Sequence, residues 1–78
     1  MRNIGKELEK KLKLIGIDSA EALRKSGSKE VFFRLKTSFP NVCLVHLYAL
    51  QGAIDGLAYN ELSAKVKWDL KDYCDMLR

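Results

Sequence analysis

The chain has 78 residues, of which 47% are hydrophobic and 31% are charged, and its formal net charge is +4. This length suits one domain with a modest core and leaves little room for a cofactor-sized cavity, and the composition excludes a disordered chain. We therefore expect residues 1–78 to form a single domain that folds alone.

Positive charge is concentrated in the first half of the chain. Residues 1–36 hold ten basic and five acidic side chains, a balance of +5, whereas residues 37–78 balance to −1. A basic half favours an anionic partner, and nucleic acid before a membrane, because no helix pattern combines a basic face with a bulky aromatic one. A solvated lysine-rich surface explains the charge equally well.

The opening segment predicts a helix from about Glu7 to Ile15. Apolar residues recur along it at helical spacing, and three lysines, Lys6, Lys10 and Lys13, fall on the opposite face. Gly5, just before this helix, leaves backbone N–H groups uncovered at the positive end of the helix dipole. That arrangement suits a phosphate or another anion, so we expect a binding feature here and not a catalytic one.

Two further helices are expected before the only proline. One runs from Asp18 to Ser26 with Asp18 as its N-cap, and the next runs from Lys29 to about Ser38 with Ser28 as its cap. Phe33 and Phe39 are expected to seal the junctions with neighbouring helices.

Pro40 favours the first turn of a helix, so the fourth helix is predicted from Pro40 to Ile54. Because this segment is apolar on every side, it should lie at the centre of the domain, with Leu47, Leu50 and Ile54 almost fully buried. The final helix, from about Ser63 to Met76, leaves Trp68 on its outer face, where another part of the chain covers it or a partner binds it. The chain is thus predicted to be all-α, with five helices and no strand.

No set of side chains in the sequence forms an active site. The single histidine, His46, has no acidic residue one turn away, so we expect a structural histidine that bonds a backbone carbonyl, and no enzyme. Cys43 and Cys74 lack the paired spacing of a zinc site and are expected to be buried, reduced thiols of a cytoplasmic protein. No metal or other cofactor is expected, and the longest apolar run, from Val42 to Leu50, is too short to span a membrane.

Two runs of residues carry a family resemblance. The first comprises Asn3-Ile4-Gly5-Lys6, Leu12, Gly16-Ile17, Glu21 and Leu23, and the second comprises Leu47-Tyr48-Ala49-Leu50 and Gly52-Ala53-Ile54. Together they resemble the C-terminal domain of the TfoX (Sxy) competence regulators over nearly the whole chain. The opening is also similar to the second half of the hairpin in the C-terminal domain of the RNA polymerase alpha subunit.

The resemblance implies a compact fold of the helix-hairpin-helix kind, a class whose members often bind the DNA backbone through the hairpin turn. The match puts Asn3, Ile4, Gly5 and Lys6 at that turn. Full-length relatives have an additional N-terminal domain and regulate DNA-uptake genes together with a transcription activator. Because this chain begins two residues before Asn3, we expect that domain and the first hairpin helix to be absent.

Two functions follow from these observations. The first is a non-enzymatic module that touches DNA phosphates weakly and without sequence preference, through Asn3, Gly5, Lys6, Lys10 and Lys13. The second is an adaptor without nucleic acid, in which Trp68 or the open hairpin edge docks on a transcription component or on a second copy of the chain. A salt-dependent DNA titration separates the two, because phosphate binding responds steeply to salt.

Overall fold

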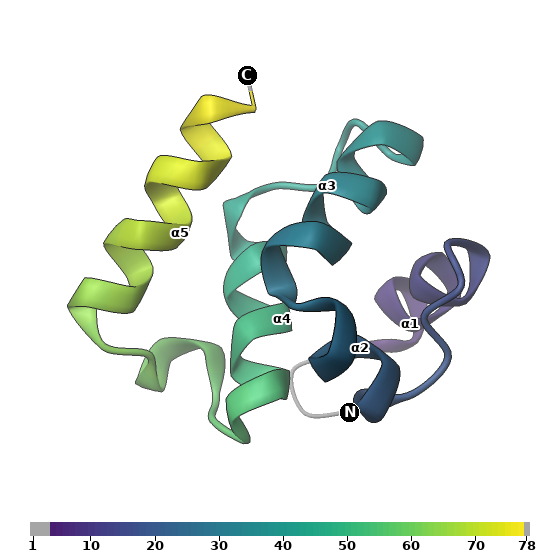
Figure 1. The fold of residues 1–78 in the computed structure, drawn as a ribbon, viewed down its shortest axis with the longest axis horizontal. Coiled ribbons are helices and arrows are strands. Elements are labelled where there is room, and N and C mark those ends of the chain that lie inside the picture. The colour runs from purple at the N-terminus through teal and green to yellow at the C-terminus, as the bar shows by residue number, and fades with distance from the viewer. Residues whose placement is uncertain (1–3, 78) are drawn as a thin grey trace.

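The computed structural model describes residues 4–77, and in that part of the chain it contains five α-helices, one short 3₁₀ helix and no strand (Figure 1). The elements are α1 (Lys6–Leu14), α2 (Ala20–Ser26), α3 (Ser28–Ser38), α4 (Leu44–Asp55), η1 (Tyr59–Glu61) and α5 (Ala64–Met76). The predicted all-α fold is confirmed. The 3₁₀ helix was not expected from the sequence.

Helix α4 occupies the centre, as its apolar sequence predicts. It contacts α2, α3, η1 and α5, while α1 packs on α3 at one side of the molecule and α5 lies at the other (Figure 1). Leu47 and Leu50 are fully buried. Ile54 is only partly buried, contrary to the prediction, because it lies in the last turn of α4, where the helix ends at Gly56 near the surface.

The predicted start of α4 is wrong by four residues. Pro40 lies in a turn, and the helix begins at Leu44 with Cys43 as its N-cap. Lys36 of α3 fixes this turn, because its Nζ donates to the carbonyl oxygens of Pro40 at 3.2 Å and Val42 at 2.9 Å. These carbonyls are therefore bonded by a side chain instead of entering a helix.

The altered start of α4 also changes the surroundings of the cysteine and the histidine. Cys43 is exposed, contrary to the prediction, because an N-cap residue lies at the helix end and not inside the apolar pattern. His46 has a structural role, but its Nδ1 accepts the backbone N–H of Cys43 at 3.0 Å instead of bonding a carbonyl. Cys74 is buried, as expected.

The caps of α2 and α3 differ from the prediction by one residue each. Ser19, not Asp18, caps α2, and its hydroxyl oxygen accepts the N–H of Ala22 at 3.1 Å. Ser28 lies inside α3 and is buried, because its hydroxyl donates to Gln51 Oε1 of α4 at 2.6 Å. Gly27 alone separates α2 from α3, and its φ of +87° is a conformation that glycine adopts without strain.

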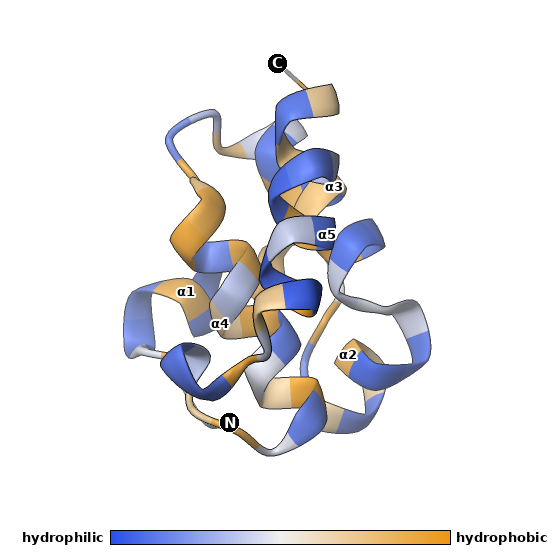
Figure 2. Ribbon diagram, turned by 90° about the vertical axis from the view of Figure 1, so that its left-hand side faces the viewer, coloured by the Kyte–Doolittle hydropathy of each residue, from blue (hydrophilic) through white to orange (hydrophobic). Residues whose placement is uncertain are grey.

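Helix α5 contains both polar and apolar residues (Figure 2). Its apolar residues recur at helical spacing, so one face packs against α4 and the other faces solvent. Leu70 and Cys74 are buried on the inner face. Trp68 on the outer face is 71% exposed, so no described part of the chain covers it. Lys29 of α3 forms an ion pair with Asp69 of α5, with 2.8 Å between Lys29 Nζ and Asp69 Oδ2.

The two phenylalanines at the expected junctions behave differently. Phe39 packs partly buried against the core, with Lys11 Nζ 5.4 Å from the centre of its ring. Phe33 is 47% exposed and seals no junction, contrary to the prediction, because it points to the outer side of α3. Within residues 4–77, none of the helices has the length and hydropathy that crossing a membrane requires.

Candidate nucleic-acid interface

The start of α1 is an uncapped helix end. Gly5 is the N-cap residue, with extended backbone angles (φ −77°, ψ 172°), and no described side chain bonds to the helix end. The first bond of the helix runs from the N–H of Glu9 to the carbonyl oxygen of Gly5 at 2.9 Å, so the N–H groups of residues 6–8 have no acceptor within the helix. These groups, together with the helix dipole, favour an anion at this end.

Access to this helix end is unobstructed by the described residues. Gly5 is exposed, and a Cβ atom built on it would meet no heavy atom within 4 Å. A phosphate oxygen can therefore approach the backbone closely. Asn3, the other residue that the sequence predicts for this turn, lies outside the described residues.

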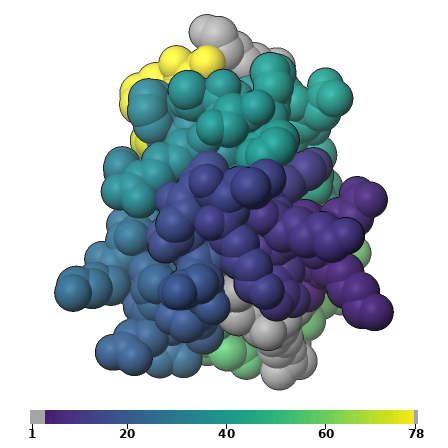
Figure 3. All heavy atoms as spheres, turned by 90° about the vertical axis from the view of Figure 1, so that its right-hand side faces the viewer, coloured from purple at the N-terminus to yellow at the C-terminus, as the bar shows by residue number. Residues whose placement is uncertain are grey.

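The three predicted lysines of α1 lie together on its exposed side. Lys6, Lys10 and Lys13 line one shallow hollow of about 270 Å³. In the space-filling view, α1 lies across one face of the molecule beside α3, with long side chains that extend outward (Figure 3). The grouping that the helical period predicts is thus present, while the role of these residues stays a prediction.

One acidic residue interrupts this face, and the sequence reasoning did not include it. Glu9 lines the same hollow and pairs with Lys13, with 3.5 Å between Glu9 Oε1 and Lys13 Nζ. Their spacing of four residues was the signal in the sequence, since such pairs meet on a helix surface. Lys6 and Lys10 have no carboxylate partner among the described residues, so they are the two lysines free to bind an anion.

Trp68 belongs to a different surface. It lies on α5, on the opposite side of α3 and α4 from α1 (Figure 1). Its exposed neighbours one turn away include Lys65, Lys71 and Asp72, so both charge signs surround it. The two predicted sites therefore lie on opposite sides of the domain, so a single small molecule does not contact both.

A catalytic or metal centre requires several side chains that act together on a metal ion or a substrate. Among the described residues, no group of three or more His, Cys, Asp or Glu side chains is placed to hold a metal ion. The contact between Cys43 Sγ and His46 Nδ1, 3.4 Å long, lies at the start of α4, and no further side chain among residues 4–77 bonds the His46 ring.

The fold and the site together define a small all-α domain with an open helix end and a basic helix face. The chain belongs to the TfoX C-terminal domain family, whose model matches residues 1–74. This membership confirms the resemblance seen in the sequence. The chain has no match among curated proteins.

Two solved structures from Listeria monocytogenes are similar to the chain. One is the triclinic crystal form of an uncharacterized protein, with 39% sequence identity and a TM-score of 0.97, covering 99% of this chain and 88% of that one. The other is the tetragonal form of a protein of unknown function, with 39% identity and a TM-score of 0.94, covering 97% and 93%. Their likeness supports the helical arrangement described above and adds no activity to it.

Proposed function

We propose that this domain is a non-enzymatic binding module that contacts the phosphate backbone of nucleic acid through the start of α1. The observation that carries the proposal is the uncapped, open helix end at Gly5 beside Lys6 and Lys10, which lack carboxylate partners among the described residues. Backbone N–H groups and the dipole attract one phosphate there, and the lysines attract the phosphates that follow.

The contact is weak and independent of sequence. The lysine face of α1 has no Arg, Asn or Gln side chain to read the edges of bases, and Glu9 offsets part of its charge. Few phosphates are neutralised, so the expected dissociation constant is about 10⁻⁴–10⁻⁶ M, the range of non-specific binding. In a TfoX-type protein such a contact would hold a transcription component near DNA without choosing the site.

A titration of the isotope-labelled chain with two unrelated DNA duplexes tests this proposal. Amide shifts should concentrate in residues 5–13, and the two duplexes should bind with affinities within about threefold of each other. Shifts confined to α5, or no shifts at low salt, would remove the proposal.

The second candidate function is an adaptor that binds a protein through Trp68. The observation in its favour is the exposure of Trp68, 71%, which is large for the residue type most enriched at interaction hot spots. The same titration separates the candidates, since an adaptor surface on α5 does not respond to DNA.

A further inference from the structure

An exposed apolar groove lies at the other end of α1. Leu14, the last residue of α1, is 76% exposed, and Phe33 of α3 is 47% exposed. With Ile15, Arg34, Thr37 and Ser38 they line a groove of about 360 Å³ between α1 and α3. Apolar side chains gathered in a hollow with polar neighbours mark an interaction surface more often than scattered ones do.

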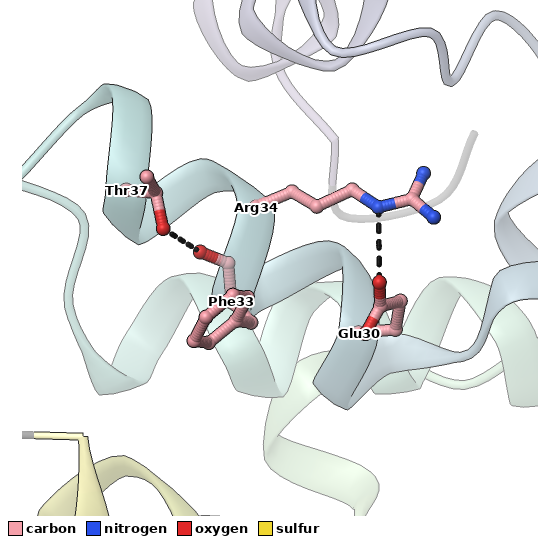
Figure 4. Close-up of polar contacts among 4 residues, drawn as sticks. All are labelled: Glu30, Phe33, Arg34 and Thr37. Carbon is pink, nitrogen blue, oxygen red and sulfur yellow. Dashed lines mark hydrogen bonds and ion pairs between the residues drawn. The ribbon is translucent and has the colours of Figure 1, made fainter.

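One polar side chain of this groove, Thr37, stays hydrogen-bonded when water is removed. The hydroxyl of Thr37 donates to the carbonyl oxygen of Phe33 at 3.0 Å within α3 (Figure 4). An apolar partner that covers the groove therefore leaves this hydroxyl bonded, and avoids the cost of an unsatisfied donor.

The rim of the groove is basic. Arg34 Nε bonds Glu30 Oε1 at 3.1 Å, while the two terminal nitrogens of Arg34 extend past that bond (Figure 4) and have no partner among the described residues. Lys10 is exposed, also lacks a carboxylate partner there, and precedes Leu14 by one helical turn, so it lies on the same side of α1. Arg34, paired with Glu30 through Nε alone, and Lys10, without a carboxylate partner among the described residues, thus lie on the two helices that border the apolar groove.

We propose that this groove docks an acidic amphipathic helix of another protein. An apolar side chain of that helix fills the space between Leu14 and Phe33, and its carboxylates meet Arg34 and Lys10. This is the helix-in-groove mode of recognition, with a forked guanidinium suited to a carboxylate. The proposal goes beyond nucleic-acid binding: the two surfaces share Lys10, but Gly5 and Lys6 at the start of α1 take no part in the groove.

Charge complementarity decides between this occupant and a second copy of the chain. One exposed helix that the chain itself offers is α5, where Lys65, Lys71 and Asp72 surround Trp68 and three lysines balance three aspartates over residues 64–76. Because that helix has no net negative charge, an acidic helix complements Arg34 and Lys10 better than α5 of a second copy does. A nucleic-acid backbone would meet the cations but has no apolar anchor for the groove.

Three synthetic peptides of about 16 residues test the proposal against the full chain. The first is an amphipathic helix of Leu on one face and Glu on the other, the second has Lys in place of Glu, and the third has Ala in place of Leu. Only the first should saturate, with amide shifts at residues 14, 15, 33, 34 and 37. Its affinity should fall about tenfold or more in Leu14→Ala and several-fold in Arg34→Gln.

Matched controls exclude general effects of substitution. Met76→Ala removes an apolar side chain that is 75% exposed on α5, and Lys71→Gln removes an exposed cation of the same helix, on the opposite side of the molecule from α1, so both should bind the acidic peptide as the unmodified chain does. Circular dichroism confirms that each variant is folded. Equal binding of the Glu and Lys peptides, unchanged affinity in Leu14→Ala, loss of binding in Met76→Ala, or no saturation at millimolar peptide would each overturn the proposal.

Discussion

Replacing Gly5 by Asp should stabilise the domain and at the same time remove its binding of DNA. Gly5 has φ −77°, which any residue adopts, and the position is open, so the new side chain fits. Its carboxylate can accept the N–H groups of residues 7 and 8, which have no acceptor within the helix. The new carboxylate thus occupies the place at the start of α1 where we expect a phosphate of DNA to bind.

The expected gain in stability follows from three terms. Capping by Asp exceeds capping by Gly by a few tenths of a kcal/mol, the charge at the helix start adds about 0.3–1 kcal/mol, and the loss of glycine from the unfolded chain adds about 0.4–1 kcal/mol. Repulsion by Glu7 and Glu9 in the first turn offsets part of this. A net gain of about 1 kcal/mol raises the Tm by roughly 4–8 °C for a domain of this size.

Binding should change in the opposite direction. A carboxylate that occupies the N–H groups and repels the phosphate should lower DNA affinity by about tenfold or more at low salt, measured by fluorescence anisotropy. Gly5→Ala is the matched control, because it adds a side chain without charge and should keep the affinity within about threefold. A Gly5→Asp variant that is more stable and binds DNA unchanged would show that no phosphate lies at the start of α1.

Three further predictions concern stability and assembly. Leu50→Ala, in the buried centre of α4, should cost about 2–5 kcal/mol in urea unfolding, whereas Leu14→Ala at 76% exposure should stay within about 0.5 kcal/mol, and equal costs would contradict the core assignment. Lys36→Met leaves two carbonyls of the 40–43 turn without their donor and should cost about 1–2 kcal/mol, with faster amide exchange at residues 42–44. If a second copy covers Trp68 by a two-fold contact, sedimentation should show a dimer that Trp68→Ala abolishes, and a monomeric wild type at high concentration would exclude this contact.

Periodicity predicts the helices because each buries one stripe of its own sequence. The buried pairs Leu8 and Leu12 on α1, Val31 and Leu35 on α3, and Leu70 and Cys74 on α5 each lie four residues apart, close to one helical turn. The central place of α4 follows in the same way, since a helix that is apolar on every side has no face for solvent. These features depend only on residues that are close together in the chain, so they can be predicted from the sequence alone.

The wrong boundaries depend on contacts between distant residues. The 40–43 turn is bonded by Lys36 from the preceding helix, and Ser28 is buried by its bond to Gln51, 23 residues away. Local rules for Pro and Ser favour helix starts at both places and carry no information on these partners.

The same distinction between neighbouring and distant residues applies to the candidate site. The shared face of Lys6, Lys10 and Lys13 follows from spacing, and the Glu9–Lys13 pair could have been seen from it. The groove at Leu14 and Phe33 could not have been, because it exists only through the way α1 packs against α3.

The salt dependence of DNA binding tests the central claim most directly. If Lys6 and Lys10 each neutralise one phosphate, the variant with both replaced by Gln should lose about 1.8 from the magnitude of the log–log slope of affinity against salt, at about 0.9 per phosphate. The control with Lys65→Gln and Lys71→Gln makes the same change of charge on the opposite side, on α5, and should keep the slope of the unmodified chain. Equal loss of slope in both variants, or an unchanged slope in the first, would contradict a phosphate site at the start of α1.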